Sequence, residues 1–281
     1  MKRLVYFLVV LSILMFSCSL PSTATPTPTM PPDVTAPPVV TEPPVVTEAP
    51  TATEPAVPAP NVTCHELSFY LDPSLAASTT CEIIPEQTME MDIHPQYTTI
   101  TIEDYPLQHK FFPATISVFP VQRFTELIPD YLPTLVTDLQ TIIAGGLPAE
   151  SSLPFLPIFH AAQTFHANSA LTPFVSGGGI RFLTLYAQYT APLNNQDLFY
   201  TYQGLTTDGQ YWVSAILPIN HVVLPETADP PPGGMTWEQF SANYDVYLPG
   251  MVALLEAQLP DSFSPTLTDL DALVSSISIQ P

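Results

Sequence analysis

The chain has 281 residues and a formal net charge of −21, from 26 acidic side chains against five Lys and Arg. Hydrophobic residues make up 46% of the chain, enough to build a packed core. Nucleic acids and anionic lipid headgroups require clusters of Lys and Arg, so this composition excludes both as partners. The residues also point to no cofactor.

The N-terminus has the organisation of an export signal. Lys2 and Arg3 are followed by an almost wholly apolar run from Leu4 to Phe16, broken by Ser12. This charged start and apolar run match a signal peptide. The run is too short to cross a bilayer, which needs roughly 20 apolar residues.

The end of this run resembles the lipobox of bacterial lipoprotein signal peptides, in which a small residue precedes a cysteine. Ser17 precedes Cys18, and Met15 takes the Leu-like position three residues before the cysteine. The resemblance implies that residues 1–17 are removed and that Cys18 is lipidated and anchors the chain in a membrane. Ordinary secretion with cleavage near Ser19, or an uncleaved signal anchor, remain the alternatives.

Residues 18–60 follow as the lipidated cysteine and a tether rich in Pro and Thr. Positions 21–60 contain 13 Pro and 9 Thr, and the motif PPVVTE occurs twice in tandem at 37–48. A segment with so little to bury does not offset the entropy of ordering, so we expect an extended, disordered spacer. An O-glycosylated stalk is the alternative.

Residues 61–281 are expected to form one extracytoplasmic domain. It carries 22 Asp and Glu against only Lys110, Arg123 and Arg181. Cys64 and Cys81 are predicted to form a disulfide, because exported proteins meet oxidising conditions and this pairing leaves Cys18 for the lipid. Metal ligation together with His65 is the alternative.

The domain begins with strand patterns and continues with helical ones. Alternating β-forming residues predict strands at 97–107, 114–121 and 180–191, with the glycines of SGGG as a loop before the last. Helical spacing follows Arg123, with a break and restart between Pro129 and Pro133. The clearest signal is Asp208-Gly209, which predicts a type I′ hairpin between strands at 198–206 and 210–218.

Two further helices are predicted near the C-terminus. In the first, over 235–259, Thr236 and Gln239 form a capping-box pattern, and Pro249 is expected to kink or split the helix. In the second, Ser264 is the expected N-cap and Pro265 the first helical residue. Its apolar face holds Leu267, Leu270 and Leu273.

This order of elements predicts an α+β fold, an antiparallel β-sheet with packed helices. The hairpin YQGLTTDGQYWVSAILPI followed by helices ending in LDALVSSISI resembles PsbP-like domains, and the resemblance covers residues 97–281. It implies an α-β-α sandwich. The whole chain also resembles bacterial surface lipoproteins. Neither resemblance assigns a functional residue.

Few residues suggest chemistry. Arg181 is a rare cation on an apolar strand, and it either forms an internal ion pair or binds a carboxylate ligand. His160 and His166 are six residues apart, which does not suit a zinc site on one helix. Asp269 and Asp271 are better explained as helix-start carboxylates than as calcium ligands, because the other ligands of a calcium loop are missing.

We therefore expect a noncatalytic binding or accessory module on the extracytoplasmic face of the cell membrane. Its expected partners are the membrane, through the lipid anchor, and another surface protein or a small ligand near Arg181. The alternative is an exported hydrolase or metal-dependent enzyme that uses carboxylates or a metal held by His160, His166 and an acid.

Overall fold

The computed structural model describes residues 58–89, 92–145 and 152–280. All of them belong to one compact unit, residues 54–281. The predicted signal peptide at 1–17, Cys18 and the tether up to residue 57 lie outside the described residues.

The centre of the fold is a sheet of seven strands in which every neighbouring pair is antiparallel. This arrangement confirms the predicted α+β class with an antiparallel sheet. In spatial order the strands are β3 (Ser78–Ile84), β6 (Tyr97–Glu103), β7 (Thr115–Pro120), β13 (Tyr211–Pro218), β12 (Phe199–Thr206), β10 (Gly177–Thr184) and β9 (Ala167–Phe174).

The predicted hairpin is confirmed as β12 and β13, but its turn is not type I′. That turn needs positive φ at both central residues, whereas Gly209 has φ 70° and Asp208 is not in the left-handed region. The Gly209 N–H donates to the Thr206 carbonyl over 2.8 Å, so the turn closes one residue earlier than predicted. The Asp208 carboxylate accepts from the Gln210 N–H at 3.0 Å and holds the turn.

The glycine run was wrongly predicted to be a loop. Gly177, Gly178 and Gly179 lie inside β10, paired with β9 on one side and β12 on the other. The predicted strand at 180–191 ends at Thr184. Beyond it, β11 (Tyr186–Ala187) pairs with β8 (Ala162–Gln163) in a separate two-stranded sheet.

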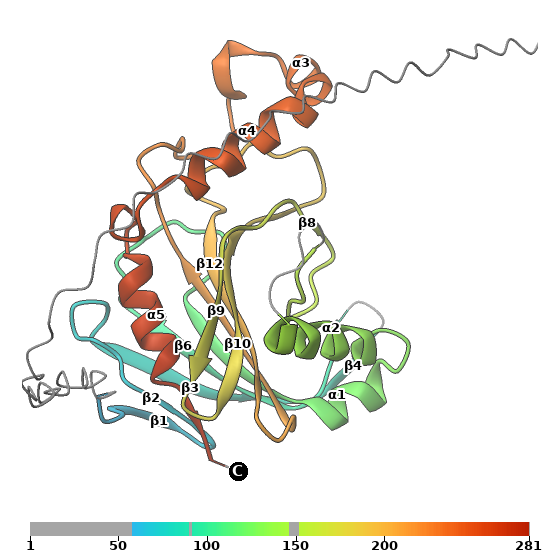
Figure 1. The fold of residues 1–281 in the computed structure, drawn as a ribbon, viewed down its shortest axis with the longest axis vertical. Helices are drawn as coiled ribbons and strands as arrows, with labels where there is room; N and C mark the ends of the chain where they lie inside the picture. The colour runs from blue at the N-terminus through green and yellow to red at the C-terminus, as the bar shows by residue number, and fades with distance from the viewer. Residues whose placement is uncertain (1–57, 90–91, 146–151, 281) are drawn as a thin grey trace, which may run out of the picture. The chain divides into compact units, whose positions relative to one another are not determined.

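One face of the large sheet is covered by α1 (Val121–Leu127) and α2 (Leu132–Gly145), so the predicted break and restart are confirmed. The buried leucines of α2 repeat at helical spacing and face the sheet, which explains why this stretch is helical. They pack on Phe182 and Trp212, which are fully buried. Figure 1 shows α1 and α2 on one side of the sheet and α5 (Leu267–Ser275) on the other.

The opposite face carries α5, α4 (Tyr244–Glu256) and a small sheet of β1 (Val62–Cys64), β2 (Leu67–Phe69) and β14 (Ser278–Ile279). The predicted leucine face of α5 is fully buried. Its N-cap is Thr266, whose hydroxyl accepts from the Asp269 N–H at 3.0 Å, and not Ser264 as predicted. Pro265 therefore precedes the helix.

The helix predicted over 235–259 divides into α3 (Trp237–Ala242) and α4. The capping box of Thr236 and Gln239 is confirmed. The division falls at Asn243, and α4 continues through Pro249. Pro249 and Asp245 are both exposed, so water can satisfy the carbonyl that loses its helical partner.

The remaining elements are short. They are the antiparallel pair of β4 (Gln87–Met89) and β5 (Asp92–His94) and the 3₁₀ turns η1 (Pro232–Gly234) and η2 (Pro260–Ser262). None of the helices in the described part of the chain has the length and apolarity that a membrane crossing needs.

Candidate functional site

Arg181 of β10 lies against α5 and is engaged within the chain. Its Nε atom is 3.2 Å from Asp271 Oδ1, in an ion pair without hydrogen-bond geometry. Its Nη1 donates to the carbonyl of Asn168. The Tyr200 hydroxyl donates to the same Asp271 oxygen at 2.9 Å. Of the two predicted roles for Arg181, the structure shows the internal ion pair.

Burial and hydrogen bonding act in opposite directions on the carboxylate of this network. Burial raises the pKa of Asp271, and the Arg181 charge and the Tyr200 hydroxyl partly oppose that shift. Burial also raises the pKa of Tyr200, which is fully buried. The three side chains connect β10 and β12 to α5, so we assign them a structural role. Asp271 was interpreted from the sequence as a helix-start carboxylate, and this pairing was missed.

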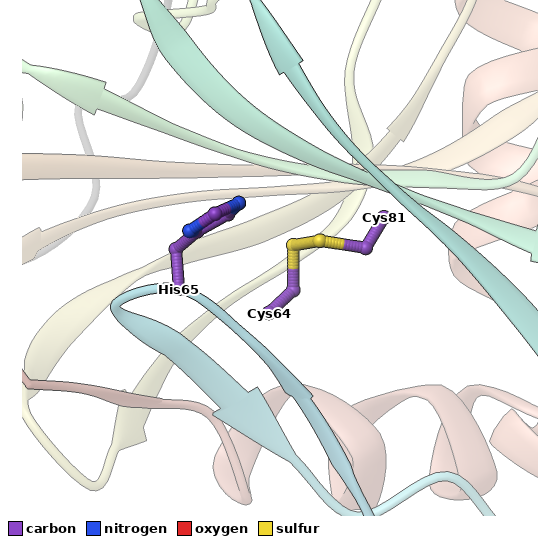
Figure 2. A group of neighbouring side chains, drawn as sticks. All are labelled: Cys64, His65 and Cys81. Atoms are coloured by element: carbon purple, nitrogen blue, oxygen red, sulfur yellow. A yellow bond between two sulfur atoms is a disulfide. The ribbon is translucent and has the colours of Figure 1, made fainter.

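The predicted disulfide is confirmed between Cys64 and Cys81, whose Cα atoms are 5.8 Å apart. It joins β1 of the small sheet to β3 of the large one. Figure 2 shows the His65 ring beside this disulfide. Within the described ranges, these three residues are the one group of His, Cys, Asp or Glu whose ligand atoms lie within 4.8 Å of one another. The two sulfur atoms are bonded to each other, so they are not thiolate ligands for a metal.

Among the residues that the structure describes, the two histidines of the enzyme hypothesis belong to no such group with an acid. His166 Nδ1 is 3.2 Å from the Ser169 hydroxyl. His160 instead lines two surface pockets.

The first, the histidine pocket, has a volume of about 470 Å³. It combines apolar and aromatic walls from β6, β7 and α1 with one carboxylate, Asp92, and two imidazoles, His94 and His160. His94 Nε2 is 3.7 Å from Asp92 Oδ1. Burial and the Asp92 charge raise the pKa of Tyr97 at its wall.

The second, the aromatic pocket, has a volume of about 540 Å³. Three segments far apart in the sequence supply its ring-bearing walls, and Asp197 supplies a carboxylate. The full lining is Phe111, Phe112, Phe159, His160, Ala161, Tyr186, Ala187, Gln188, Tyr189 and Asp197.

Rings packed against one another support the wall of the aromatic pocket. Phe112 and Phe159 stack with centroids 4.7 Å apart and planes 5° apart. Tyr186 meets Phe159 edge-on at 5.1 Å and also packs on Phe155 at 4.7 Å. Phe112 contacts Phe199 of β12 at 5.2 Å. These contacts fix the wall to the central sheet.

The rim of the aromatic pocket carries aromatic side chains that are largely exposed to solvent. Phe111 is 65% exposed and Tyr189 is 55% exposed. Trp237 of α3 packs on Tyr189 with ring centroids 5.9 Å apart, which extends the aromatic surface outward. Large exposed aromatic groups gathered at a pocket are a common mark of a binding surface.

Charge near the aromatic pocket is negative. The Asp197 and Asp229 carboxylates add to the effect of burial in raising the pKa of Tyr189. Asp197 Oδ2 accepts from Asn194 Nδ2 at 2.9 Å, which orients the carboxylate. Within the described part of the chain, Asp197 Oδ1 accepts no hydrogen bond.

Lys110 adjoins this region, and its ammonium group is already bound. It donates to the carbonyls of Asn195 and Ile219 and to Asn220 Oδ1. Burial lowers its pKa to about 8, while the charges of Glu226 and Asp197 oppose that shift. The next residue is Phe111, whose N–H donates to the Gln196 carbonyl at 3.1 Å, so this anchor sets the ring beside the loop that carries Asp197.

Among the residues that line the aromatic pocket, His160 was a candidate from the sequence and the others were not. The pair Phe111-Phe112 beside a rare lysine was a signal, because adjacent side chains in extended backbone point to opposite sides, which leaves one ring facing away from the core. A comparison of the chain with protein-family models, curated proteins and solved structures finds no match. The two resemblances stated above therefore remain predictions.

Proposed function

We propose that this chain is a lipoprotein, held at the extracytoplasmic face of the cell membrane by lipid on Cys18, whose folded unit is a noncatalytic binding module. The observation that carries the binding role is the aromatic pocket, with a rigid wall of packed rings and the exposed rings of Phe111 and Tyr189 at its rim. Concave, mostly apolar sites with a few polar groups are the usual form of small-molecule sites.

The proposal also assigns a small ligand, and not a substrate, to the aromatic pocket. Two cations outside it already have structural partners, since Arg181 pairs with Asp271 and Lys110 donates to backbone carbonyls. The proposed fold family is PsbP-like, supported by helices on both faces of an antiparallel sheet and by a long hairpin followed by C-terminal helices. An experimental structure superposed on PsbP-like domains tests that part.

The anchor is tested by expressing the full chain and a Cys18→Ser variant in a bacterial host with labelled fatty acid. We expect the wild-type chain to carry label and sediment with membranes, and the variant to lose both. A wild-type chain that carries no label and is recovered in the soluble fraction would remove the anchor from the proposal.

The binding role is tested with a ligand-observed NMR screen of cationic, anionic and neutral small molecules against the full chain. Hits should weaken at least about fivefold with Phe111→Leu, which removes an exposed ring while keeping apolar bulk. The matched control is Leu259→Ala, a truncation of an apolar residue that is 74% exposed and lies outside the pocket lining. A screen with no hit sensitive to Phe111→Leu contradicts the binding role.

A further inference from the structure

We propose that the aromatic pocket binds ligands through a quaternary ammonium group, held between the ring faces of Phe111 and Tyr189 and the carboxylate of Asp197. This inference rests on the proposed binding role and names the chemical class of the ligand. Ring faces carry negative electrostatic potential and attract cations, and quaternary ammonium groups are typical ligands of aromatic cages.

The charges at the aromatic pocket select for a cation. Its lining contains the Asp197 carboxylate and neither Lys nor Arg. The Asp197 charge opposes the lowering of the Lys110 pKa, but the Lys110 ammonium group is bound by three oxygens of the chain and, among the described residues, makes no ion pair with Asp197. The net charge of −21 adds a long-range attraction for any cation.

The polar groups of the aromatic pocket favour a quaternary ammonium over other cations. A metal ion needs several oxygen ligands held close together, and the polar side chains of the lining, His160, Tyr186, Gln188, Tyr189 and Asp197, include a single carboxylate. The Gln188 side chain already donates to the His160 carbonyl at 2.7 Å. A primary ammonium needs three hydrogen-bond acceptors, whereas a quaternary ammonium has no N–H group to satisfy and is matched by rings.

The volume of about 540 Å³ is larger than a trimethylammonium head alone, so the pocket has room for the group attached to it.

The test compares choline with 3,3-dimethyl-1-butanol, which has the same shape with carbon in place of the charged nitrogen. Titration calorimetry uses the full chain in a non-ionic detergent, because choline-like detergent headgroups would compete. We expect choline to bind at least about fivefold more tightly than its neutral isostere, as a cation–π contribution of ordinary size requires.

Two variants locate the site. Asp197→Asn keeps the shape of the side chain and the hydrogen bond to Asn194 while removing the charge. It should weaken the affinity for choline by about three- to tenfold and leave the affinity for the isostere unchanged. Glu82→Gln is the matched control, because it removes one exposed carboxylate from β3, outside the pocket lining, and it should leave choline binding unchanged. Phe111→Leu should weaken choline binding. Because the Phe111 side chain is highly exposed, its replacement is not expected to disturb folding, so misfolding would not explain the loss.

Equal affinity for choline and the isostere would overturn the inference, as would an equal effect of Asp197→Asn and Glu82→Gln. The inference is also overturned if the chain binds neither compound but binds another class of small molecule and loses that binding with Phe111→Leu. The proposed binding role would then still hold. If no class shows binding that depends on Phe111, the proposed function itself fails.

Discussion

Replacing Arg181 by methionine tests whether the Arg181–Asp271 pair is a structural clamp. Methionine keeps the length and apolar stem of the side chain and removes the charge. The Arg181 side chain is 11% exposed and that of Asp271 is 32% exposed, so the carboxylate would be left largely buried beside an apolar group. The carbonyl of Asn168 would also lose the guanidinium donor.

The cost follows from these exposures. Removing one partner from a fully buried pair costs about 3–5 kcal/mol, whereas an exposed pair contributes about 0–1 kcal/mol. Because Asp271 keeps part of its contact with water, we expect Arg181→Met to lower the free energy of unfolding by about 2–4 kcal/mol. Urea denaturation followed by fluorescence of the fully buried Trp212 measures it.

The loss should depend on pH. Without Arg181, burial raises the pKa of Asp271 further, since the main opposing influence is gone. An acid whose folded pKa is raised favours the folded state at low pH and loses that contribution as pH rises through the folded pKa. The difference between Arg181→Met and wild type should therefore be largest at neutral pH and shrink toward pH 4.

A double-mutant cycle completes this test. Asp271→Asn keeps an acceptor for the Tyr200 hydroxyl and removes the charge. We expect a coupling of about 1–3 kcal/mol between Arg181→Met and Asp271→Asn. A coupling below about 0.5 kcal/mol at pH 7, together with a loss that does not change with pH, would refute the clamp.

Two further predictions concern the disulfide and the buried lysine. Cys64→Ala with Cys81→Ala opens a loop with a sequence separation of 17 and should cost about 3 kcal/mol in urea, matched by wild type under reductant; equal stability with and without reductant would contradict this. Lys110 has a folded pKa of about 8, below its unfolded value, so the folded state binds fewer protons between these values. The stability of wild type minus that of Lys110→Met should then rise from pH 8 to pH 10, and a fall would contradict the lowered pKa.

Local patterns predicted the elements that depend on local interactions. The alternation around Asp208-Gly209 specified β12 and β13, and the capping box of Thr236 and Gln239 specified the start of α3. The prediction was wrong where the sequence offered two equivalent capping residues. Ser264 and Thr266 are both hydroxyl residues near the start of α5, and only the tertiary position of the helix decides which one meets the Asp269 N–H.

The aromatic pocket could not be predicted from local sequence patterns, because its position also depends on tertiary packing. Its rings come from segments around 111, 159, 186 and 189, and they meet only after β8 and β11 pair and Phe112 stacks on Phe159. Arg181 could be recognised as unusual from the charge balance. Its partner could not, because Asp271 is 90 residues further along the chain and reaches it only through the packing of α5.

The glycine run in β10 gives a last prediction with its control in the adjacent residue. A Cβ at Gly179 would lie 2.3 Å from the Gln203 carbonyl oxygen and 2.6 Å from the Tyr202 hydroxyl, whereas a Cβ at Gly178 would meet only Ile143, at 3.6 Å. Both positions are in the same strand and have the same propensity.

Tyr202 crosses over Gly179 to donate to the Thr172 carbonyl of β9 at 3.0 Å, so glycine there allows a buried tyrosine to reach its partner. We expect Gly179→Ala to lower the free energy of unfolding by about 2–4 kcal/mol, because overpacking also breaks this buried hydrogen bond. Gly178→Ala should change it by less than about 1 kcal/mol. Equal effects in urea denaturation would mean that the run is there for backbone freedom, as the sequence first suggested, and not for the approach of Tyr202.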